Sequence, residues 1–184
     1  MRITTRTGRW LAASAVACCA TLLPGAALAA SAAPAAPARS AAHAIVPGCE
    51  TPGLVIWLDT NGNGAAGSIF YNLEFTNLSG HRCTLNGFPF INAVSLTGGL
   101  LGHRAAVDHT TTPHTVTVDQ GQTVKAVLQI ADVGNIPPAT CKPVTAAGLR
   151  VFPPNQTRAK VVPFPFGACS ASGPVFLQVQ PVTK

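Results

Sequence analysis

The sequence is poor in charged and aromatic side chains. Only 10% of its 184 residues are Asp, Glu, Lys or Arg, and 6% are aromatic. The basic residues are scattered singly, without a run interleaved with aromatic rings, which argues against a nucleic-acid surface. No apolar stretch reaches the roughly 20 residues that a membrane-spanning helix needs. We therefore expect a protein that binds no nucleic acid and whose mature form has no membrane span.

Motifs that assemble catalytic machinery are also missing. The sequence has no Gly-x-Ser-x-Gly nucleophile elbow. It has no close Cys-x-x-Cys pair of the kind that zinc sites use. The single methionine, Met1, excludes a methionine-based copper carrier. These absences predict a protein that is not an enzyme, uses no cofactor and has no catalytic or dedicated metal-binding residues.

The N-terminus has the pattern of a secretory signal peptide. Three arginines precede an apolar run at residues 10–23, and Ala27-Leu28-Ala29 supplies the small residues that a signal peptidase reads. We expect residues 1–29 to be removed, and the product to be secreted, either extracellular or associated with the cell wall. A lipid anchor on Cys18 is disfavoured because the apolar run continues past that cysteine.

A linker is expected between the signal peptide and the folded domain. Residues 30–46 are mostly Ala, Pro and Ser, and such a composition offers too little apolar surface to form a core. We therefore predict a disordered linker over residues 30–46 and a single folded domain over residues 47–184.

Four cysteines follow the predicted signal peptide: Cys49, Cys83, Cys141 and Cys169. In a small exported domain, four cysteines typically form two disulfides, and three pairings are open to them. We favour Cys49 with Cys83 and Cys141 with Cys169, because each bond closes a loop of about thirty residues. In the chain-entropy model, each such bond stabilises the fold by about 3 to 4 kcal/mol.

The pattern of apolar residues beyond Cys49 is that of short strands. The clearest strands are expected at residues 68–76 and 122–131; in the first, Ile69, Tyr71, Leu73 and Phe75 share one face. Weaker strands are expected at residues 53–59, 90–96, 101–107, 115–119, 148–152, 158–162 and 175–179. This number of short strands predicts an all-β, two-sheet sandwich. Trp57 is expected in the core, packed against a disulfide.

Two blocks of the sequence resemble a known family. Asn77-Leu78-Ser79-Gly80, followed by Cys83-Thr84-Leu85-Asn86-Gly87-Phe88-Pro89, is similar to the first half of domain-of-unknown-function family 4232. Leu149-Arg150-Val151-Phe152-Pro153-Pro154-Asn155-Gln156 is similar to a later block, and the likeness covers about residues 49–182. The family is typical of secreted and lipid-anchored actinobacterial proteins. The resemblance implies an immunoglobulin-like antiparallel β-sandwich and brings no known activity or catalytic residues.

Two groups of loop residues are candidates for an interaction site. The proline-flanked segment at residues 137–143 lies beside Cys141, and a loop held rigid in an extended form binds with little ordering cost. Pro138, Lys142 and Pro143 are its candidate residues.

The second group is His103, His109 and His114, which lie within twelve residues of one another. Imidazole is a common ligand of transition metals. The spacing of these histidines matches no established metal site, and Asp108 beside His109 offers a carboxylate without a marked nucleophile.

The sequence therefore predicts a secreted, non-catalytic binding module whose partner is an unknown protein or a cell-wall component. The alternatives are a secreted protease inhibitor that uses residues 137–143 and an exported metal-binding protein that uses the histidines. No oligomeric state follows from the sequence.

Overall fold

The computed structural model describes residues 45–184. The predicted signal peptide, Cys18 and nearly all of the predicted linker lie outside the described residues. The strands are β1 (Leu54–Ala65), β2 (Ser68–Asn77), β3 (Cys83–Asn86), β4 (Phe90–Val94), β5 (Leu100–Leu101), β6 (Ala106–Val107), β7 (Thr115–Val118), β8 (Thr123–Ala131), β9 (Pro143–Phe152), β10 (Lys160–Cys169) and β11 (Leu177–Val179). Short helical turns are η1 (Thr51–Gly53), η2 (Val133–Asn135) and α1 (Pro138–Cys141).

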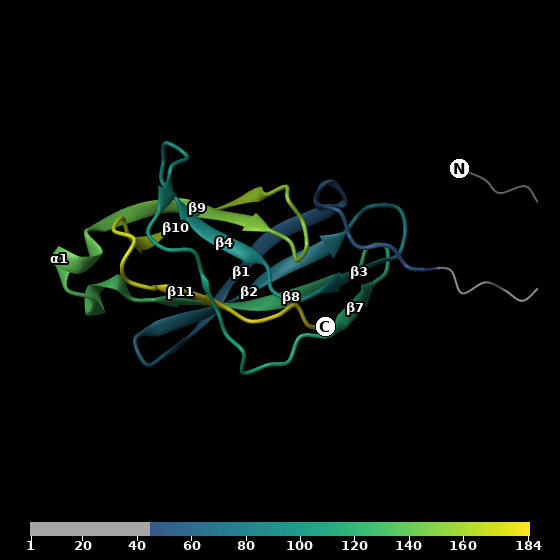
Figure 1. The fold of residues 1–184 in the computed structure, drawn as a ribbon, viewed down its shortest axis with the longest axis horizontal. Coiled ribbons are helices and arrows are strands. Elements are labelled where there is room, and N and C mark those ends of the chain that lie inside the picture. The colour runs from purple at the N-terminus through teal and green to yellow at the C-terminus, as the bar shows by residue number, and fades with distance from the viewer. Residues whose placement is uncertain (1–44) are drawn as a thin grey trace, which may run out of the picture. The chain divides into compact units, whose positions relative to one another are not determined.

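The strands form three sheets, so the mostly β fold that the sequence predicts is confirmed. The five-stranded sheet has the order β1-β2-β8-β11-β6, the four-stranded sheet β10-β9-β4-β5, and the two-stranded sheet β3-β7. In Figure 1, β4, β9 and β10 run side by side in the upper half of the view, and β8 and β11 lie in the lower half. Within residues 45–184, no helix is long and apolar enough to cross a membrane.

One hydrophobic core is shared by the sheets. Strands β2 and β8 pair in antiparallel register, with Leu73 opposite Ala126 and Phe75 opposite Val124. These side chains are buried in the same cluster as residues of β4 and β9, such as Leu149. The edges of the two larger sheets also meet, where the Lys160 ammonium donates a hydrogen bond to the carbonyl oxygen of Leu54.

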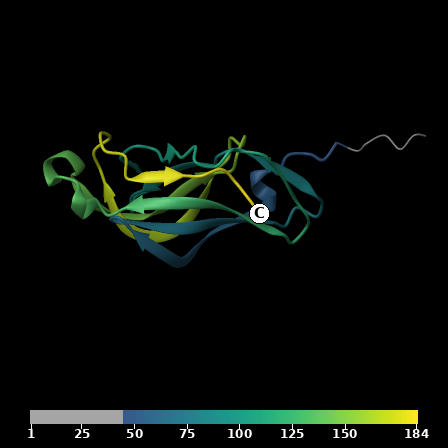
Figure 2. The ribbon, with the colours of Figure 1, turned by 90° about the horizontal axis from the view of Figure 1, so that it is seen from below.

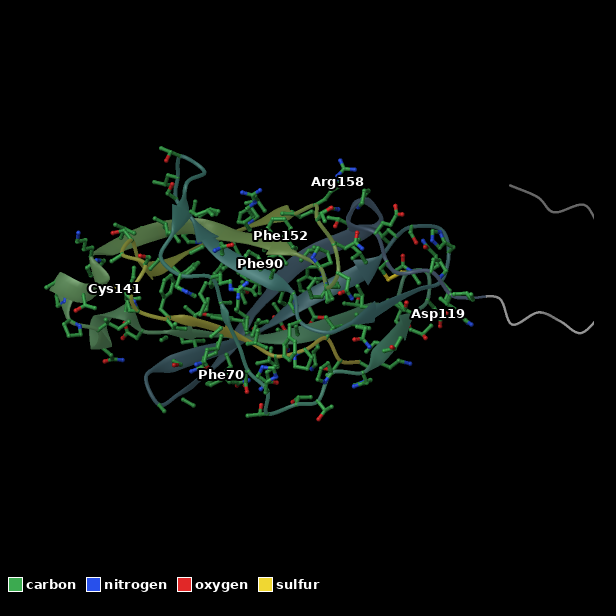
Figure 3. All side chains as sticks on the ribbon, viewed as in Figure 1. Phe70, Phe90, Asp119, Cys141, Phe152 and Arg158 are labelled. Carbon is green, nitrogen blue, oxygen red and sulfur yellow. A yellow bond between two sulfur atoms is a disulfide. The ribbon has the colours of Figure 1, made fainter. Side chains whose placement is uncertain are left out.

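The predicted disulfide pairing is confirmed. Cys49 is bonded to Cys83, with 4.9 Å between their Cα atoms, and Cys141 is bonded to Cys169, with 4.6 Å between theirs. Cys83 lies opposite Val118, which directly precedes Asp119, and Figure 3 shows Asp119 and Cys141 at opposite ends of the molecule. Each end of the fold is therefore closed by its own disulfide.

The side chains predicted to share one face of β2 differ in burial along the strand. Leu73 and Phe75 are fully buried, whereas Ile69 is 43% exposed. At the Ile69 end, the hairpin of β1 and β2 projects beyond the neighbouring strands, as both views of the ribbon show (Figures 1 and 2). The alternating pattern predicts which side chains share a face of β2. It does not predict how far along the strand the other sheet covers that face.

Trp57 is not the core residue that the sequence predicts. It is 43% exposed, while Ile56 and Leu58 on either side are buried. Because side chains alternate along a strand, these neighbours occupy the core face and Trp57 points outward. Its indole Nε1 donates a hydrogen bond to Thr76 Oγ1, at 3.3 Å.

The strand expected at residues 101–107 is two short strands in different sheets. β5 pairs with β4, and β6 pairs in parallel with β11. Gly102 between them has a φ of 58°, and a Cβ there would lie 2.7 Å from the carbonyl oxygen of Cys169. This left-handed glycine breaks the strand and lets the chain cross between the sheets.

β10 is longer than the sequence predicts, because it continues to Cys169 through Pro163 and Pro165. Proline lacks an N–H donor and is tolerated at a sheet edge. β10 is such an edge strand, and its pairing with β9 shifts between Pro163 and Phe166.

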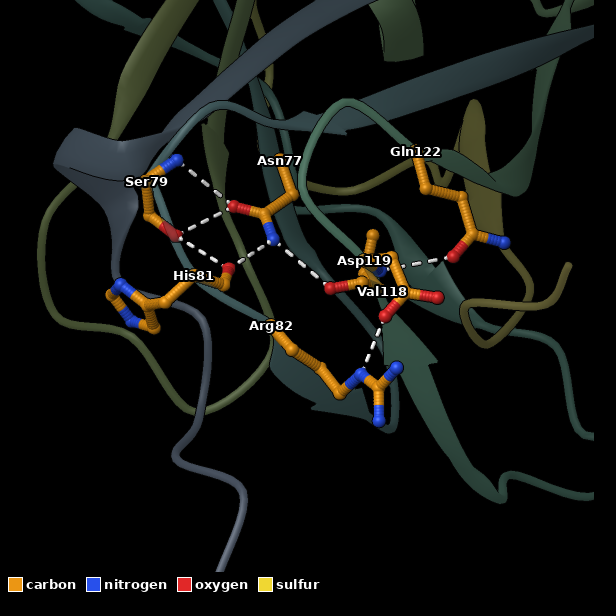
Figure 4. A network of polar contacts seen from close by, with 7 residues as sticks. All are labelled: Asn77, Ser79, His81, Arg82, Val118, Asp119 and Gln122. Carbon is orange, nitrogen blue, oxygen red and sulfur yellow. Dashed lines mark hydrogen bonds and ion pairs between the residues drawn. The ribbon is translucent and has the colours of Figure 1, made fainter. Parts of the chain in front are cut away.

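Asn77, at the end of β2, is fully buried and has all its polar atoms paired. Its Nδ2 donates to the carbonyl oxygens of His81 at 2.8 Å and Val118 at 2.9 Å. Its Oδ1 accepts from the amide and hydroxyl of Ser79, at 3.0 and 2.7 Å. Figure 4 shows this network joining the turn after β2 to the end of β7.

We predict that Asn77→Ala destabilises the protein strongly. The change leaves the buried carbonyl oxygen of Val118 and the Ser79 amide without the partner that Asn77 provides, and a cost of about 2 to 4 kcal/mol is expected. Asn86→Ala is the matched control, since Asn86 is exposed and its Nδ2 makes one side-chain hydrogen bond, to Thr115. Urea unfolding of both variants gives the comparison. Equal losses of unfolding free energy would contradict the importance of the Asn77 network.

Candidate functional site

The segment at residues 137–143 is not extended, contrary to the sequence prediction. Pro138 begins α1, a single helical turn, and Lys142 follows it with a φ of 49°. The carbonyl oxygen of Lys142 accepts hydrogen bonds from both the amide and the hydroxyl of Ser170. Pro143 begins β9. The segment is folded against the chain after Cys169, so it does not have the extended geometry of a substrate-like inhibitor loop.

The three histidines do not form a ligand set. In the part of the chain that the structure describes, no group of three or more His, Cys, Asp or Glu side chains is placed to hold a metal ion. His109 instead packs edge-on against the ring of Phe88, with 5.3 Å between centroids. His103 Nδ1 lies 3.0 Å from the carbonyl oxygen of Arg104, and His114 is exposed just before β7.

A groove of about 500 Å³ lies beside the projecting hairpin of β1 and β2. We call it the hairpin groove. Its walls come from the tip of the hairpin, the end of β8, the start of η2 and the middle of β10, and include Ala65, Ile69, Tyr71, Val133, Phe164 and Phe166. Ligand sites in proteins are typically concave, mostly apolar and of this size. The hairpin groove is therefore the best candidate for a binding site.

An aromatic cluster forms one wall of the hairpin groove. The rings of Tyr71 and Phe164 meet edge to face at 5.1 Å, and Phe164 stacks with Phe166 at 5.9 Å. Phe166 in turn contacts Phe176, which is buried in the core. The aromatic wall is thus continuous with the core, so its rings are held in place before any ligand arrives.

Glycine gives the wall its close packing on the hairpin side. Gly62 lies in the irregular part of β1 between Asp59 and Asn63. A Cβ at Gly62 would lie 2.6 Å from the ring of Tyr71 and 2.5 Å from Ile69. Only a glycine lets the β1 backbone approach both side chains this closely.

The polar groups around the hairpin groove are largely committed to the fold. Ser68 Oγ accepts a hydrogen bond from Gln129 at 2.9 Å. Asp132 Oδ1 accepts from the amide of Gly134 at 2.9 Å, capping η2, and the Asp132 amide donates to the carbonyl oxygen of Gly67. The exposed Asp132 carboxylate leaves negative charge at the rim of an otherwise apolar site.

Most of this site is not predicted by the sequence. The alternating pattern places Ile69 and Tyr71 on one face of their strand, but no functional residue is expected there or in β10. The signal was present in Pro163-Phe164-Pro165-Phe166, where two prolines mark an edge strand and the alternation puts both phenylalanines on one side. The sequence does not show that this side of β10 faces the projecting hairpin of β1 and β2.

Two carboxylates outside the groove have pKa values that are shifted in opposite directions. Burial raises the pKa of Glu74, against the opposing effect of Lys125, which lies opposite it on β8. Hydrogen bonds from the Thr110 amide and the Gln180 side chain lower the pKa of Asp108. Asp108 is thus held ionised as an acceptor, a structural role that suits neither a general acid nor a base working near neutral pH.

The comparisons with known proteins show the family. Residues 49–183 match the family described as "Domain of unknown function (DUF4232)", and the chain belongs to this family. No curated protein and no solved structure matches the chain. The resemblance that the sequence motifs indicate is therefore confirmed.

We predict opposite pH dependences for Glu74 and Asp108. The raised pKa of Glu74 means that its stabilising contribution is present at low pH and is lost as the pH rises through its folded-state value. The lowered pKa of Asp108 means that its contribution is present above its unfolded value and is lost as the pH falls through its folded-state value.

NMR titration of the carboxyl groups checks both directions, with Glu74→Gln and Asp108→Asn to assign the signals. Glu74 should titrate above a glutamate in an unfolded peptide, and Asp108 below an aspartate in one. A Glu74 pKa below that of a glutamate in an unfolded peptide would contradict the effect of burial. An Asp108 pKa above that of an aspartate in an unfolded peptide would contradict the effect of its hydrogen bonds.

Proposed function

For this member of the family, we propose a secreted, non-catalytic binding module with an immunoglobulin-like sandwich fold, which holds an apolar segment of a protein partner in the hairpin groove. The observation that carries the proposal is the aromatic wall of Tyr71, Phe164 and Phe166, which is open to the groove and anchored in the core. The larger sheets on one shared core support the sandwich fold.

Export is supported by two independent features. The N-terminal sequence has the basic, apolar and small-residue regions of a signal peptide. The two disulfides are typical of proteins that fold in an oxidising compartment, and cytosolic proteins rarely keep such bonds.

The chemistry of the groove favours a peptide segment over a glycan. A bound sugar needs hydrogen-bond partners for its many hydroxyl groups, and unpaired polar groups are costly to bury. Ser68 and Asp132 Oδ1 already bond to Gln129 and Gly134, so the Tyr71 hydroxyl and the second Asp132 oxygen are the main side-chain polar atoms of the groove that remain for a ligand. An apolar side chain needs none, and the Asp132 carboxylate suits a basic residue next to it.

The groove supports binding more readily than catalysis. Nucleophilic or acid–base catalysis needs a nucleophile beside a base, or two titrating groups set apart in pKa. Apart from Tyr71, Asp132 is the one ionisable side chain among the residues that line the groove, and it caps η2.

We predict that Ile69→Asp weakens the binding of apolar ligands. The probe is the neutral dye N-phenyl-1-naphthylamine, whose fluorescence rises in an apolar site. The substitution places a carboxylate in the groove wall. The dye should therefore bind at least tenfold more weakly, which corresponds to a loss of about 1.4 kcal/mol in binding free energy. Because Ile69 is 43% exposed, the fold should tolerate the change.

Val55→Asp is the matched control for this experiment. Val55 lies on the neighbouring strand β1, is also 43% exposed and does not line the groove. The control should bind the dye as the unmodified protein does. Equal binding by both variants, no binding by the unmodified protein, or displacement of the dye by neutral oligosaccharides would each count against the proposed site.

A further inference from the structure

A second surface, on the outer side of the four-stranded sheet, has a different chemistry. Phe90 on β4 and Phe152 on β9 are directly opposite each other in the antiparallel ladder. Their rings are perpendicular, with 5.4 Å between centroids, and Phe90 is 42% exposed. Figure 3 shows the two residues side by side, on the part of the sheet away from Cys141.

An arginine guanidinium lies over each of these two rings. The Arg104 guanidinium carbon lies 5.4 Å from the centroid of Phe90, and that of Arg150 lies 5.3 Å from the centroid of Phe152. Arg150 shares a face of β9 with Phe152 because it precedes it by two residues. Arg104 comes from the segment between β5 and β6, and both arginines are exposed. We call these four residues the arginine–phenylalanine face.

Neither arginine has an acidic partner within residues 45–184. The one salt bridge there joins Arg82 to Asp119, in the network at the other side of the fold. All six acidic residues of the protein lie within this range, so no carboxylate of the chain neutralises the arginine–phenylalanine face. Two positive charges without an acidic partner therefore lie over two neighbouring rings of this surface.

The geometry favours an anionic ligand. A guanidinium held over an aromatic ring keeps its N–H groups free at its edge, where they bind the two oxygens of a phosphate or carboxylate together. The ring also fixes the side chain and removes part of its water, which lowers the cost of binding. Two such groups, over rings on adjacent strands, present two anion contacts. Several linked contacts along one ligand chain strengthen the overall binding.

We propose that the arginine–phenylalanine face binds a linear anionic polymer that carries phosphate or carboxylate groups at intervals along a hydroxylated chain. Arg104 and Arg150 bind successive anionic groups, and the exposed ring of Phe90 contacts the uncharged part between them. This site is separate from the hairpin groove and does not depend on the function proposed for it.

The test measures the binding of fluorescein-labelled polyglycerol phosphate and polygalacturonate, with neutral dextran as the reference polymer. Binding to the first assigns phosphate as the ligand group, and binding to the second assigns carboxylate. Affinity should fall as salt rises, because exposed charges are screened. Binding to neither polyanion, or equal binding to dextran, would overturn the proposal.

Variants separate this face from general charge attraction. The Arg104→Gln, Arg150→Gln double variant should bind at least tenfold more weakly than the unmodified protein. The Lys142→Gln, Lys184→Gln double variant loses the same charge elsewhere and should change binding less than threefold. Arg104→Lys with Arg150→Lys keeps the charge but loses the two-pronged contact, so it should fall between them. Equal losses in the two glutamine variants would show attraction by net charge alone and refute the site.

Discussion

The fold depends on the buried amide of Asn77. A polar side chain that is fully removed from water destabilises a protein unless each of its atoms is paired, and Asn77 reaches this state with bonds to Ser79, His81 and Val118. These bonds define the turn that ends β2 and fix it against the end of β7. The chain then enters β3 with Cys83 opposite Val118 and bonded to Cys49. One side chain thus aligns the turn, the small sheet and a disulfide.

The opposite end of the fold is held by different means and contains the candidate binding site. Cys169 ends β10, the strand that supplies Phe164 and Phe166, and is bonded to Cys141, the last residue of α1. Backbone contacts between Asp132 and Gly67 hold the hairpin to the end of β8. The hairpin groove is therefore framed by rigid elements, although its own surface is left uncovered. The end that contains the Asn77 network thus contributes to stability, while the end that contains the hairpin groove exposes apolar surface.

Much of this fold follows from the sequence, because its determinants are local. The alternation at Leu73 and Phe75 gives a strand and its face, and the spacing of the cysteines favours the pairing that is found. One error is local: Trp57 points outward because its neighbours Ile56 and Leu58 take the core side. Other errors arise where distant contacts decide, as at Gly102, where the chain lies close to the carbonyl oxygen of Cys169. The groove needs the hairpin and β10 together, and no local pattern places them side by side.

The arginine–phenylalanine face shows the same limit. Phe152 and Arg150 belong to one strand and could be paired from their spacing alone. Phe90 and Arg104 join them only through the pairing of β4 with β9 and the path of the chain after β5. Functional surfaces of a β-sheet are assembled across strands, so they become visible only once the register is known.

The most direct test of the hairpin groove as a binding site is an amide NMR titration of ¹⁵N-labelled protein with N-phenyl-1-naphthylamine. Glycine amides report on both ends of the fold at once. Shift changes should concentrate at Gly64, Gly67 and Gly167, which line the groove, and be absent at Gly80 and Gly121, which lie near Asn77. Changes at Gly80 and Gly121, or none at the groove glycines, would contradict the account.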